Sequence, residues 1–180
     1  NCVVFKPANL VPGCAWALTE IIHRHLPSGV FNLVMGTGSI VGSSLLEDRR
    51  INGVSFTGSV STGSLIAAAC SQRGAKFQLE MGGKNPLVIL NDADLETAVN
   101  CAVNGAYFST GQRCTASSRL IVEAGIHDEF VEALVTKINT LRVDDPLNEG
   151  TDIGPVVDQS QLNQDLDYLR IGREEGAELL

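Results

Sequence analysis

One cysteine of this sequence has neighbours that suit a nucleophile. Cys114 follows the cation Arg113 and a turn that contains Gly111, and the hydroxyl residues around it are small enough to leave room for a ligand. A thiol attacks only as its thiolate, which a neighbouring positive charge or a helix N-terminus favours. The pattern therefore predicts a thiolate nucleophile, with core packing of a buried cysteine as the alternative interpretation.

A carboxylate upstream is placed where it could act as a base. Glu80 ends an expected strand, and Gly82 and Gly83 follow it closely. Glycines permit positive φ and let the backbone approach a ligand, and a carboxylate in such a place can serve as a general base. An ion pair with Lys84 or a solvated strand end would explain the same residue without chemistry.

Two glycine-containing turns could bind phosphate. The turn over 57–59 (Thr-Gly-Ser) lies between an expected strand and an expected helix. Free N–H groups and the positive dipole end at a helix start suit a pyrophosphate, although an ordinary helix cap is the alternative. The turn over 36–42 spells G-x-G-x-x-x-G, one residue longer than the usual dinucleotide fingerprint, and no acidic residue is placed to bind a ribose. It is a weaker signal, with a plain turn as its alternative.

The elements that must position these residues follow the order of a parallel α/β sheet. Apolar runs bounded by Gly and Pro predict strands, and apolar residues at three- and four-residue spacing predict helices. We expect strands over 2–6, 31–35, 53–56, 77–80, 86–90 and 119–123, and helices over 11–26, 60–71, 95–108, 127–141 and 159–175, with a further short helix ending near 47. Strands that alternate with helices predict the α/β class.

Composition narrows the classes of function. The 180 residues are 44% hydrophobic and carry a net charge of −8, which permits a real core and argues against nucleic acid and anionic membrane surfaces as partners. The five cysteines include no C-x-x-C pair, which favours a reducing compartment, and no metal site is expected from the three histidines. Without a long apolar run or a signal peptide, the chain is expected to be soluble and cytoplasmic. It begins inside an apolar run, so we expect a fragment.

Three of these runs together resemble the signatures of the aldehyde dehydrogenase superfamily. They are F-T-G-S at 56–59, E-M-G-G-K at 80–84 and G-Q-R-C at 111–114, in the order of the family. The resemblance covers essentially the whole chain and is nearest to the branch acting on dicarboxylic semialdehydes, particularly α-ketoglutaric semialdehyde dehydrogenase (2,5-dioxovalerate dehydrogenase). It implies a Rossmann-like fold that is the middle of a longer polypeptide, with 1–82 the C-terminal part of the NAD(P)-binding domain and 83–180 the N-terminal part of the catalytic domain.

The resemblance also implies roles for individual residues. Cys114 would form a thiohemiacetal and then a thioester with a small-molecule aldehyde, and Glu80 would activate the water that releases the carboxylic acid. A cofactor, NAD or NADP, would contact the residues that match the family's binding positions: Lys6, Ala8, Asn9, Gly38, Phe56, Thr57, Gly58, Ser59, Met81 and Gly82. The full-length protein would be a homodimer or homotetramer.

Two positions bear on specificity. Many NAD-preferring members have glutamate where this sequence has Asn9, and that glutamate holds the ribose hydroxyls and repels a 2′-phosphate. Asparagine removes the repulsion, so we expect both cofactors to be used. Arg113 could bind the distal carboxylate of a semialdehyde acid through two hydrogen bonds, or it could form a structural salt bridge.

Other functions remain as alternatives. Within the family, succinic or glutaric semialdehyde, or a broad range of aldehydes, could be the substrate. A thiol hydrolase without redox chemistry is disfavoured, because no histidine lies in a motif beside Cys114. An inactive structural or binding relative on the same fold is disfavoured by the intact Cys114 and Glu80.

Overall fold

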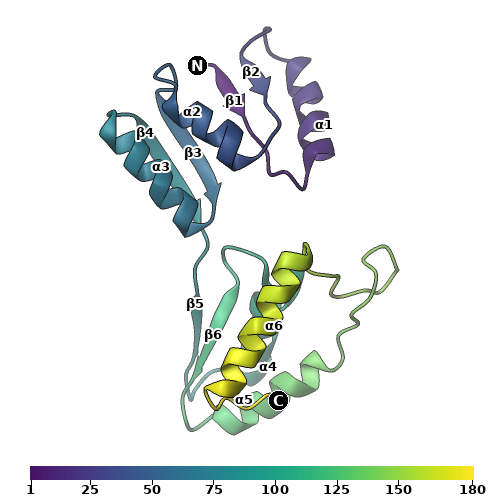
Figure 1. Ribbon diagram of the computed structural model, residues 1–180. Helices are drawn as coiled ribbons and strands as arrows, with labels where there is room; N and C mark the ends of the chain where they lie inside the picture. Colours follow the sequence, from purple (N-terminus) through teal and green to yellow (C-terminus); the bar gives the residue numbers. More distant parts are fainter. The chain divides into compact units, whose positions relative to one another are not determined.

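The chain forms two compact units. The computed structural model describes all residues, Asn1–Leu180, and they divide into Asn1–Met81 and Gly82–Leu180 (Figure 1). Each of the three strand pairs is parallel, as the predicted α/β class requires. None of the helices combines the length and the apolar character needed to cross a bilayer. No group of three or more His, Cys, Asp or Glu side chains is arranged to hold a metal ion.

The first unit contains two β-α-β arrangements. Its elements are β1 (Val3–Phe5), α1 (Pro12–His23), β2 (Phe31–Leu33), a π-helical turn (Gly38–Gly42), α2 (Ser43–Glu47), β3 (Gly53–Gly58), α3 (Val60–Gln72) and β4 (Lys76–Met81). β1 pairs with β2 and β3 with β4. Helix α1 starts with Pro12, whose fixed φ suits a first helical position. In each pair the carboxyl ends of the strands share one edge, which is where ligands bind in open α/β sheets.

The second unit packs helices on one further strand pair. Its elements are β5 (Asn85–Ile89), α4 (Leu95–Ala106), a 3₁₀ turn (Phe108–Gly111), β6 (Ser117–Val122), α5 (His127–Ile138) and α6 (Gln159–Glu174). β5 and β6 are parallel, and α4 lies between them in sequence. The core joins β5, α4 and α5, and its buried members are Ile89, Val99, Ala102, Val103, Ile126, Phe130 and Leu134. Phe130 is only 1% exposed, so α5 is held firmly in this core.

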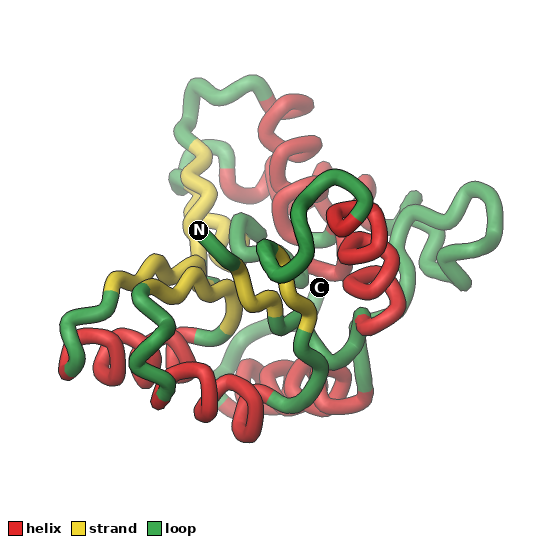
Figure 2. The backbone as a smooth tube through the Cα atoms, turned by 90° about the horizontal axis from the view of Figure 1, so that it is seen from above, coloured by secondary structure: helices red, strands yellow, loops and turns green.

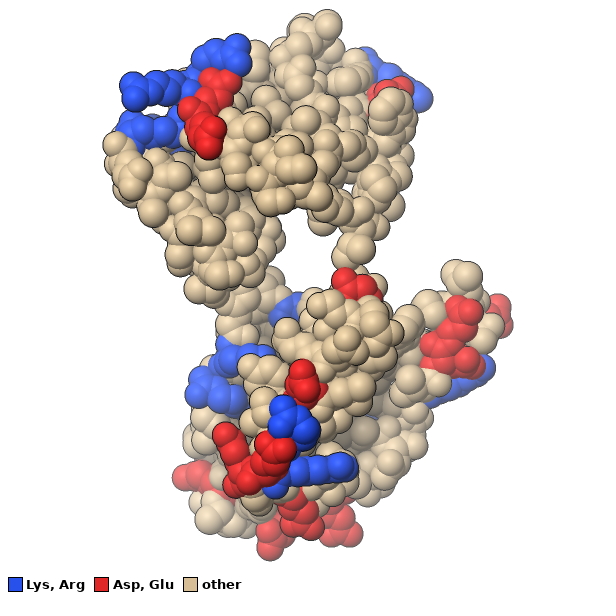
Figure 3. Space-filling view, in the orientation of Figure 1, with Lys and Arg blue, Asp and Glu red and all other residues tan.

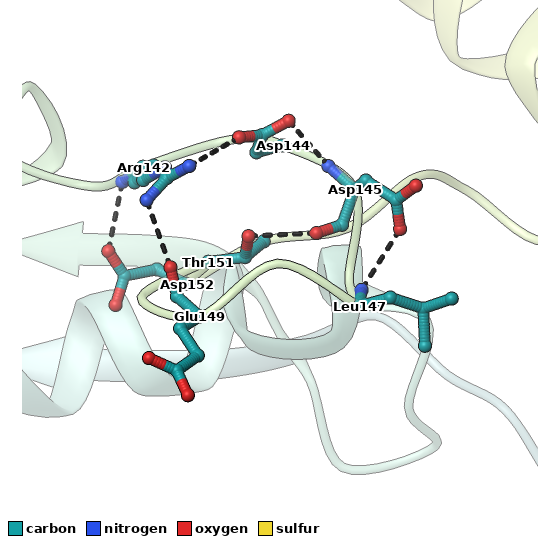
Figure 4. A network of polar contacts seen from close by, with 7 residues as sticks. All are labelled: Arg142, Asp144, Asp145, Leu147, Glu149, Thr151 and Asp152. Atoms are coloured by element: carbon teal, nitrogen blue, oxygen red, sulfur yellow. Dashed lines mark hydrogen bonds and ion pairs between the residues drawn. The ribbon is translucent and has the colours of Figure 1, made fainter.

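A long loop between α5 and α6 is held by a network of polar contacts in which Arg142 takes part in three hydrogen bonds (Figures 2 and 4). The Arg142 guanidinium donates to Asp144 Oδ2 at 2.7 Å and to the Glu149 carbonyl at 2.9 Å, and the Arg142 backbone N–H donates to Asp152 Oδ2 at 2.9 Å. The hydrogen bond from Arg142 lowers the pKa of the Asp144 carboxyl below its ordinary value. The loop is therefore ordered without regular secondary structure.

The structure corrects several bounds of the sequence prediction: α1 ends at His23 and not 26, β2 at Leu33 and not 35, and α5 at Ile138 and not 141. Strand β3 continues to Gly58, so Thr57 and Gly58 belong to the strand and not to a turn. Helix α4 ends at Ala106 instead of near 108, because the chain enters a 3₁₀ turn in which Ser109 and Thr110 have φ of 53° and 55°. Two successive left-handed residues cannot continue a right-handed helix.

Candidate active site

The carboxyl ends of β3 and β4 bring four of the predicted residues side by side. In the register of this parallel pair, Thr57 is opposite Glu80 and Gly58 is opposite Met81. Partners on neighbouring strands lie about 4.8 Å apart. Glu80 is exposed at this edge. The predicted base and part of the predicted cofactor site therefore occupy adjacent strand ends of the same unit.

The start of α3 presents backbone donors next to these strand ends. Ser59 caps the helix, and its Oγ accepts the Thr62 N–H at 3.2 Å. The N–H groups of Val60 and Ser61 donate to no acceptor in the chain, and the first turn has no acidic residue. Aligned peptide dipoles make the start of a 13-residue helix positive. These features fit a diphosphate group, such as that of a dinucleotide.

Two glycines let this helix start and the strand ends pack closely. A Cβ added to Gly58 would stand 2.5 Å from Cζ of the Phe56 ring, and a Cβ added to Gly63 would collide with the Met81 sulfur. Neither position therefore tolerates a side chain without movement of its neighbours. In Figure 3 one group of basic side chains lies over the region where β3 and β4 begin. The helix start contributes partial positive charge at the predicted cofactor edge, which also carries the Glu80 carboxylate.

Lys6 joins the loops that follow β1 and β2. Its ammonium donates to the Pro7 carbonyl at 2.7 Å and to the Gly36 carbonyl at 3.1 Å. An ammonium has three N–H donors, so one is left for another acceptor. Ala8 and Asn9, which follow directly, are exposed. Lys6 therefore links the predicted ribose contacts to the loop that leads into Gly38.

Cys114 lies in a tight turn at the entrance to β6. The Ala116 N–H donates to the Arg113 carbonyl at 3.0 Å, which closes the turn around Cys114. The Cys114 thiol is free and exposed in this chain and is not packed in its core. The side-chain amide of Asn85 donates to the carbonyl of Cys114 at 2.8 Å and to that of Ala116 at 3.1 Å. The turn is thereby tied to the first residue of β5.

The residues before this turn are held in an uncommon backbone conformation. Ser109, Thr110 and Gly111 all have positive φ. A non-glycine residue in this region costs on the order of 1 kcal/mol or more, so neighbouring contacts must compensate. The Gln112 side chain supplies such contacts: its Nε2 donates to Thr110 Oγ1, and its Oε1 accepts the Val157 N–H at 3.1 Å. Gln112 thus connects the residues that precede Cys114 to the segment before α6.

Arg113 contacts the end of α4. Its guanidinium donates to the Asn104 carbonyl and lies over the Phe108 ring, with 5.2 Å between Cζ and the ring centroid. No carboxylate of the chain pairs with Arg113, so the structure does not show the salt bridge that was the alternative to substrate binding. A cation near a helix C-terminus interacts favourably with the helix dipole. The side chain is exposed and keeps further N–H donors.

Sequence reasoning missed Asn85 and the second contact of Gln112. Both act on backbone groups far away in the sequence, across 29 to 45 residues. Neither has a local pattern that distinguishes it from an ordinary polar residue beside a proline or a glycine.

A surface pocket of about 750 Å³ between α4 and α5 is lined by none of the predicted site residues, so it is not part of the candidate site.

Comparison with known proteins assigns the family. The sequence profile described as "Aldehyde dehydrogenase family" matches residues 1–180. The chain belongs to this family. Alpha-ketoglutaric semialdehyde dehydrogenase of Bacillus subtilis (strain 168) is 46% identical over 181 residues, which is 100% of this chain and 37% of that protein. The family resemblance drawn from the three sequence motifs is confirmed.

Solved structures show the same fold. Betaine aldehyde dehydrogenase from Staphylococcus aureus, in complex with NAD⁺, has a TM-score of 0.93 and 35% identity over 97% of this aldehyde dehydrogenase chain and 35% of its own. A structure described as an E. coli NADP dependent enzyme has a TM-score of 0.96 and 34% identity over 99% of this chain and 37% of its own. The chain therefore spans just over a third of the length of these relatives.

Proposed function

We propose that the protein oxidises an aldehyde to a carboxylic acid, with NAD or NADP as cofactor and Cys114 as the nucleophile. The observation that carries the proposal is the exposed Cys114 in a turn fixed on both sides, within a chain of the aldehyde dehydrogenase family. In this proposal residues 1–82 belong to the cofactor-binding domain and residues 83–180 to the catalytic domain.

The turn around Cys114 can provide both an attacking group and an oxyanion donor. The Cys114 thiolate adds to the aldehyde carbon and gives a thiohemiacetal, whose oxygen carries negative charge. The Arg113 carbonyl is engaged inside the turn by the Ala116 N–H. In a trans peptide the N–H points opposite to the carbonyl, so the Cys114 N–H points out of the turn. It donates to no atom of the chain and can stabilise the oxyanion.

The residues of the first unit would hold the cofactor. The α3 N–H groups and Ser59 would bind the diphosphate, and Lys6 and Asn9 would contact the ribose of the adenosine. The chemistry that a bound nicotinamide supplies is acceptance of a hydride. Loss of that hydride from the thiohemiacetal carbon leaves a thioester on Cys114.

Glu80 would complete the reaction. Its carboxylate takes a proton from water as the water oxygen adds to the thioester carbon, the C–S bond breaks, and the free acid and the Cys114 thiol are released. The Glu80 side chain is exposed and so is accessible to this water.

The proposed substrate is a dicarboxylic semialdehyde such as α-ketoglutaric semialdehyde. The support is the 46% identity to the Bacillus subtilis enzyme of that name and the free donors of Arg113 beside Cys114. The guanidinium would pair with the distal carboxylate. Succinic or glutaric semialdehyde fits the same argument, and a broad specificity is the second candidate because a relative named betaine aldehyde dehydrogenase has the same fold.

The test compares two cysteine variants of the full-length protein. We expect Cys114→Ala to lower the rate of reduced-cofactor formation by several orders of magnitude, as loss of a nucleophile does. Cys101→Ala removes another exposed thiol of the same unit and should retain the parental rate. Parental activity in the Cys114 variant would refute the assignment of the nucleophile. Absence of reduced cofactor with every aldehyde would instead favour an inactive relative.

A further inference from the structure

We propose that Asn85 is a positioning residue that sets the direction of the Cys114 thiol. The inference rests on the proposed function, in which Cys114 is the nucleophile. Both protons of one side-chain amide are used here, because Nδ2 donates to the carbonyls of Cys114 and Ala116. A single nitrogen therefore binds two carbonyl groups of the same turn.

The strand pair holds Asn85 in place for this contact. Asn85 is paired with Ser117 in the β5–β6 ladder, but the next residue, Pro86, is paired with Arg119. Ser118 is thus an extra residue on β6, and the register shifts between Asn85 and Pro86. Such bulges re-aim a side chain at the end of a ladder. The half-buried Asn85 amide is directed by this irregularity to the turn that enters β6.

Two peptide planes flank the Cα of Cys114, and different groups fix them. The plane before Cys114 is fixed by the hydrogen bond from the Ala116 N–H to the Arg113 carbonyl. The plane after Cys114 contains the Cys114 carbonyl, and its hydrogen bond in the structure is the one from Asn85. Together the two planes determine φ and ψ of Cys114 and so the direction of its Cα–Cβ bond. Loss of the Asn85 donors would free the plane after Cys114 and the Ala116 carbonyl, but would leave the plane before Cys114 held by the Ala116 N–H.

The expected effect is on reaction geometry and not on binding. A displacement of about 1 Å at a reacting group can lower a rate about 100-fold. We therefore expect Asn85→Asp, which keeps the shape but has no donors when ionised, to lower kcat about 100-fold with KM within about twofold. Asn85→Ser keeps one donor and should lose less activity than Asn85→Asp.

Asn32 offers a matched control. Its Nδ2 also donates to two backbone carbonyls, those of Val3 at 3.1 Å and Gly29 at 2.9 Å, but it lies on β2. Asn32→Asp therefore removes the same number and kind of hydrogen bonds from an exposed asparagine. Thermal unfolding first establishes that both Asp variants are folded. If Asn85 acts on stability alone, folded Asn85→Asp and folded Asn32→Asp should then have similar kcat values.

The deciding measurement is alkylation of individual cysteines by iodoacetamide across a pH series, read by mass spectrometry in the full-length protein. We expect Asn85→Asp and the uncharged Asn85→Ser both to change the rate of Cys114 alkylation at the high-pH plateau, where the thiolate is fully formed, while the rate of Cys101 stays unchanged, and Asn32→Asp to change neither. Unchanged Cys114 reactivity and kcat in folded Asn85→Asp would overturn the inference. If Asn85→Asp does not fold, Asn85→Ser decides by the same two readouts. Alkylation of Cys114 does not require turnover. The alkylation test can therefore fail independently of the proposed function, whose own failure would be seen as parental activity in Cys114→Ala.

Discussion

The side chain at position 9 carries no charge that could repel a 2′-phosphate. Asn9 is exposed in the loop after β1, three residues beyond Lys6. We expect Asn9→Glu to raise the ratio of kcat/KM for NAD over NADP at least about tenfold, because like charges placed together cost several kcal/mol. Asn9→Gln is neutral and should leave the ratio unchanged. Initial rates with both cofactors provide the measurement, and an unchanged ratio in Asn9→Glu would contradict the role of this residue.

Glu80 makes a prediction that separates the two halves of the reaction. Glu80→Gln keeps the size of the side chain on β4 but removes the base, so the thioester should form normally and hydrolyse slowly. We expect a burst of about one reduced cofactor per site, followed by turnover lowered about 100-fold or more. Mass spectrometry should then find the acyl group on Cys114. Glu47→Gln, at another exposed glutamate of the same unit, is the control; parental steady-state turnover in Glu80→Gln would exclude its role as base.

At the scale of elements, α3 has two functions that one residue can separate. Ser59 caps the helix through the Thr62 N–H and lies beside the free donors proposed for the diphosphate. Ser59→Ala should lower the free energy of unfolding by about 1 kcal/mol. Ser59→Asp keeps a capping oxygen and should restore stability, but its negative charge should repel a diphosphate. Thermal unfolding and cofactor titration together test this, and equal cofactor affinity in the Asp variant would argue against the site.

The turn before β3 predicts a pH dependence of stability. The hydrogen bond from Arg50 lowers the pKa of the Asp48 carboxyl to about 2, from an ordinary value of 3.8. A carboxyl whose pKa is lower in the folded than in the unfolded state stabilises the fold. This contribution is complete above the unfolded-state pKa and is lost as pH falls from about 4 to about 2. Asp48→Asn should therefore flatten the acid branch of the unfolding free energy against pH. Asp92→Asn, which removes a carboxylate from an exposed position of the other unit, is the control.

Helix starts were predicted well, because the residues that cap a helix are close to it in the sequence. Ser59 and Asp94 cap α3 and α4, which begin at 60 and 95 as predicted, whereas α1 begins one residue after its predicted start and ends at His23, three residues before its predicted end. The end of β3 was missed by two residues, because the ladder with β4 carries Thr57 and Gly58 beyond the apolar run. Tertiary pairing decides such ends, and no pattern within a single strand records it.

In the candidate site, too, local features could be predicted from the sequence and long-range contacts could not. Cys114, Glu80 and Ser59 could be singled out from residue type, turn chemistry and family motifs. The contacts that hold them could not: Asn85 reaches Cys114 across 29 residues, and Gln112 reaches Val157 across 45. These contacts depend on a register shift in one ladder and on left-handed residues such as Thr110, which has φ of 55° although nothing in its side chain demands it. The sequence therefore predicts which groups react better than what positions them.

For the whole molecule, charge is the property that should discriminate among substrates. The chain carries a net charge of −8, which repels an acidic aldehyde, so preference for one would require a local cation. Arg113 is that cation in the proposed function, exposed one residue before the nucleophile. The full-length protein should be compared on α-ketoglutaric, succinic and glutaric semialdehydes, a neutral aldehyde of similar length, and betaine aldehyde, which is cationic.

We expect the acids to have the highest kcat/KM, and Arg113→Ala to raise KM for the acids at least about tenfold while KM for the neutral aldehyde changes less than twofold. A guanidinium–carboxylate pair contributes about 1.5–3 kcal/mol, which corresponds to this ratio or more. Arg113→Lys keeps the charge but not the paired donors, so it should restore only part of the affinity. An equal rise in KM for every aldehyde would instead assign Arg113 to holding the end of α4 through the Asn104 carbonyl and the Phe108 ring.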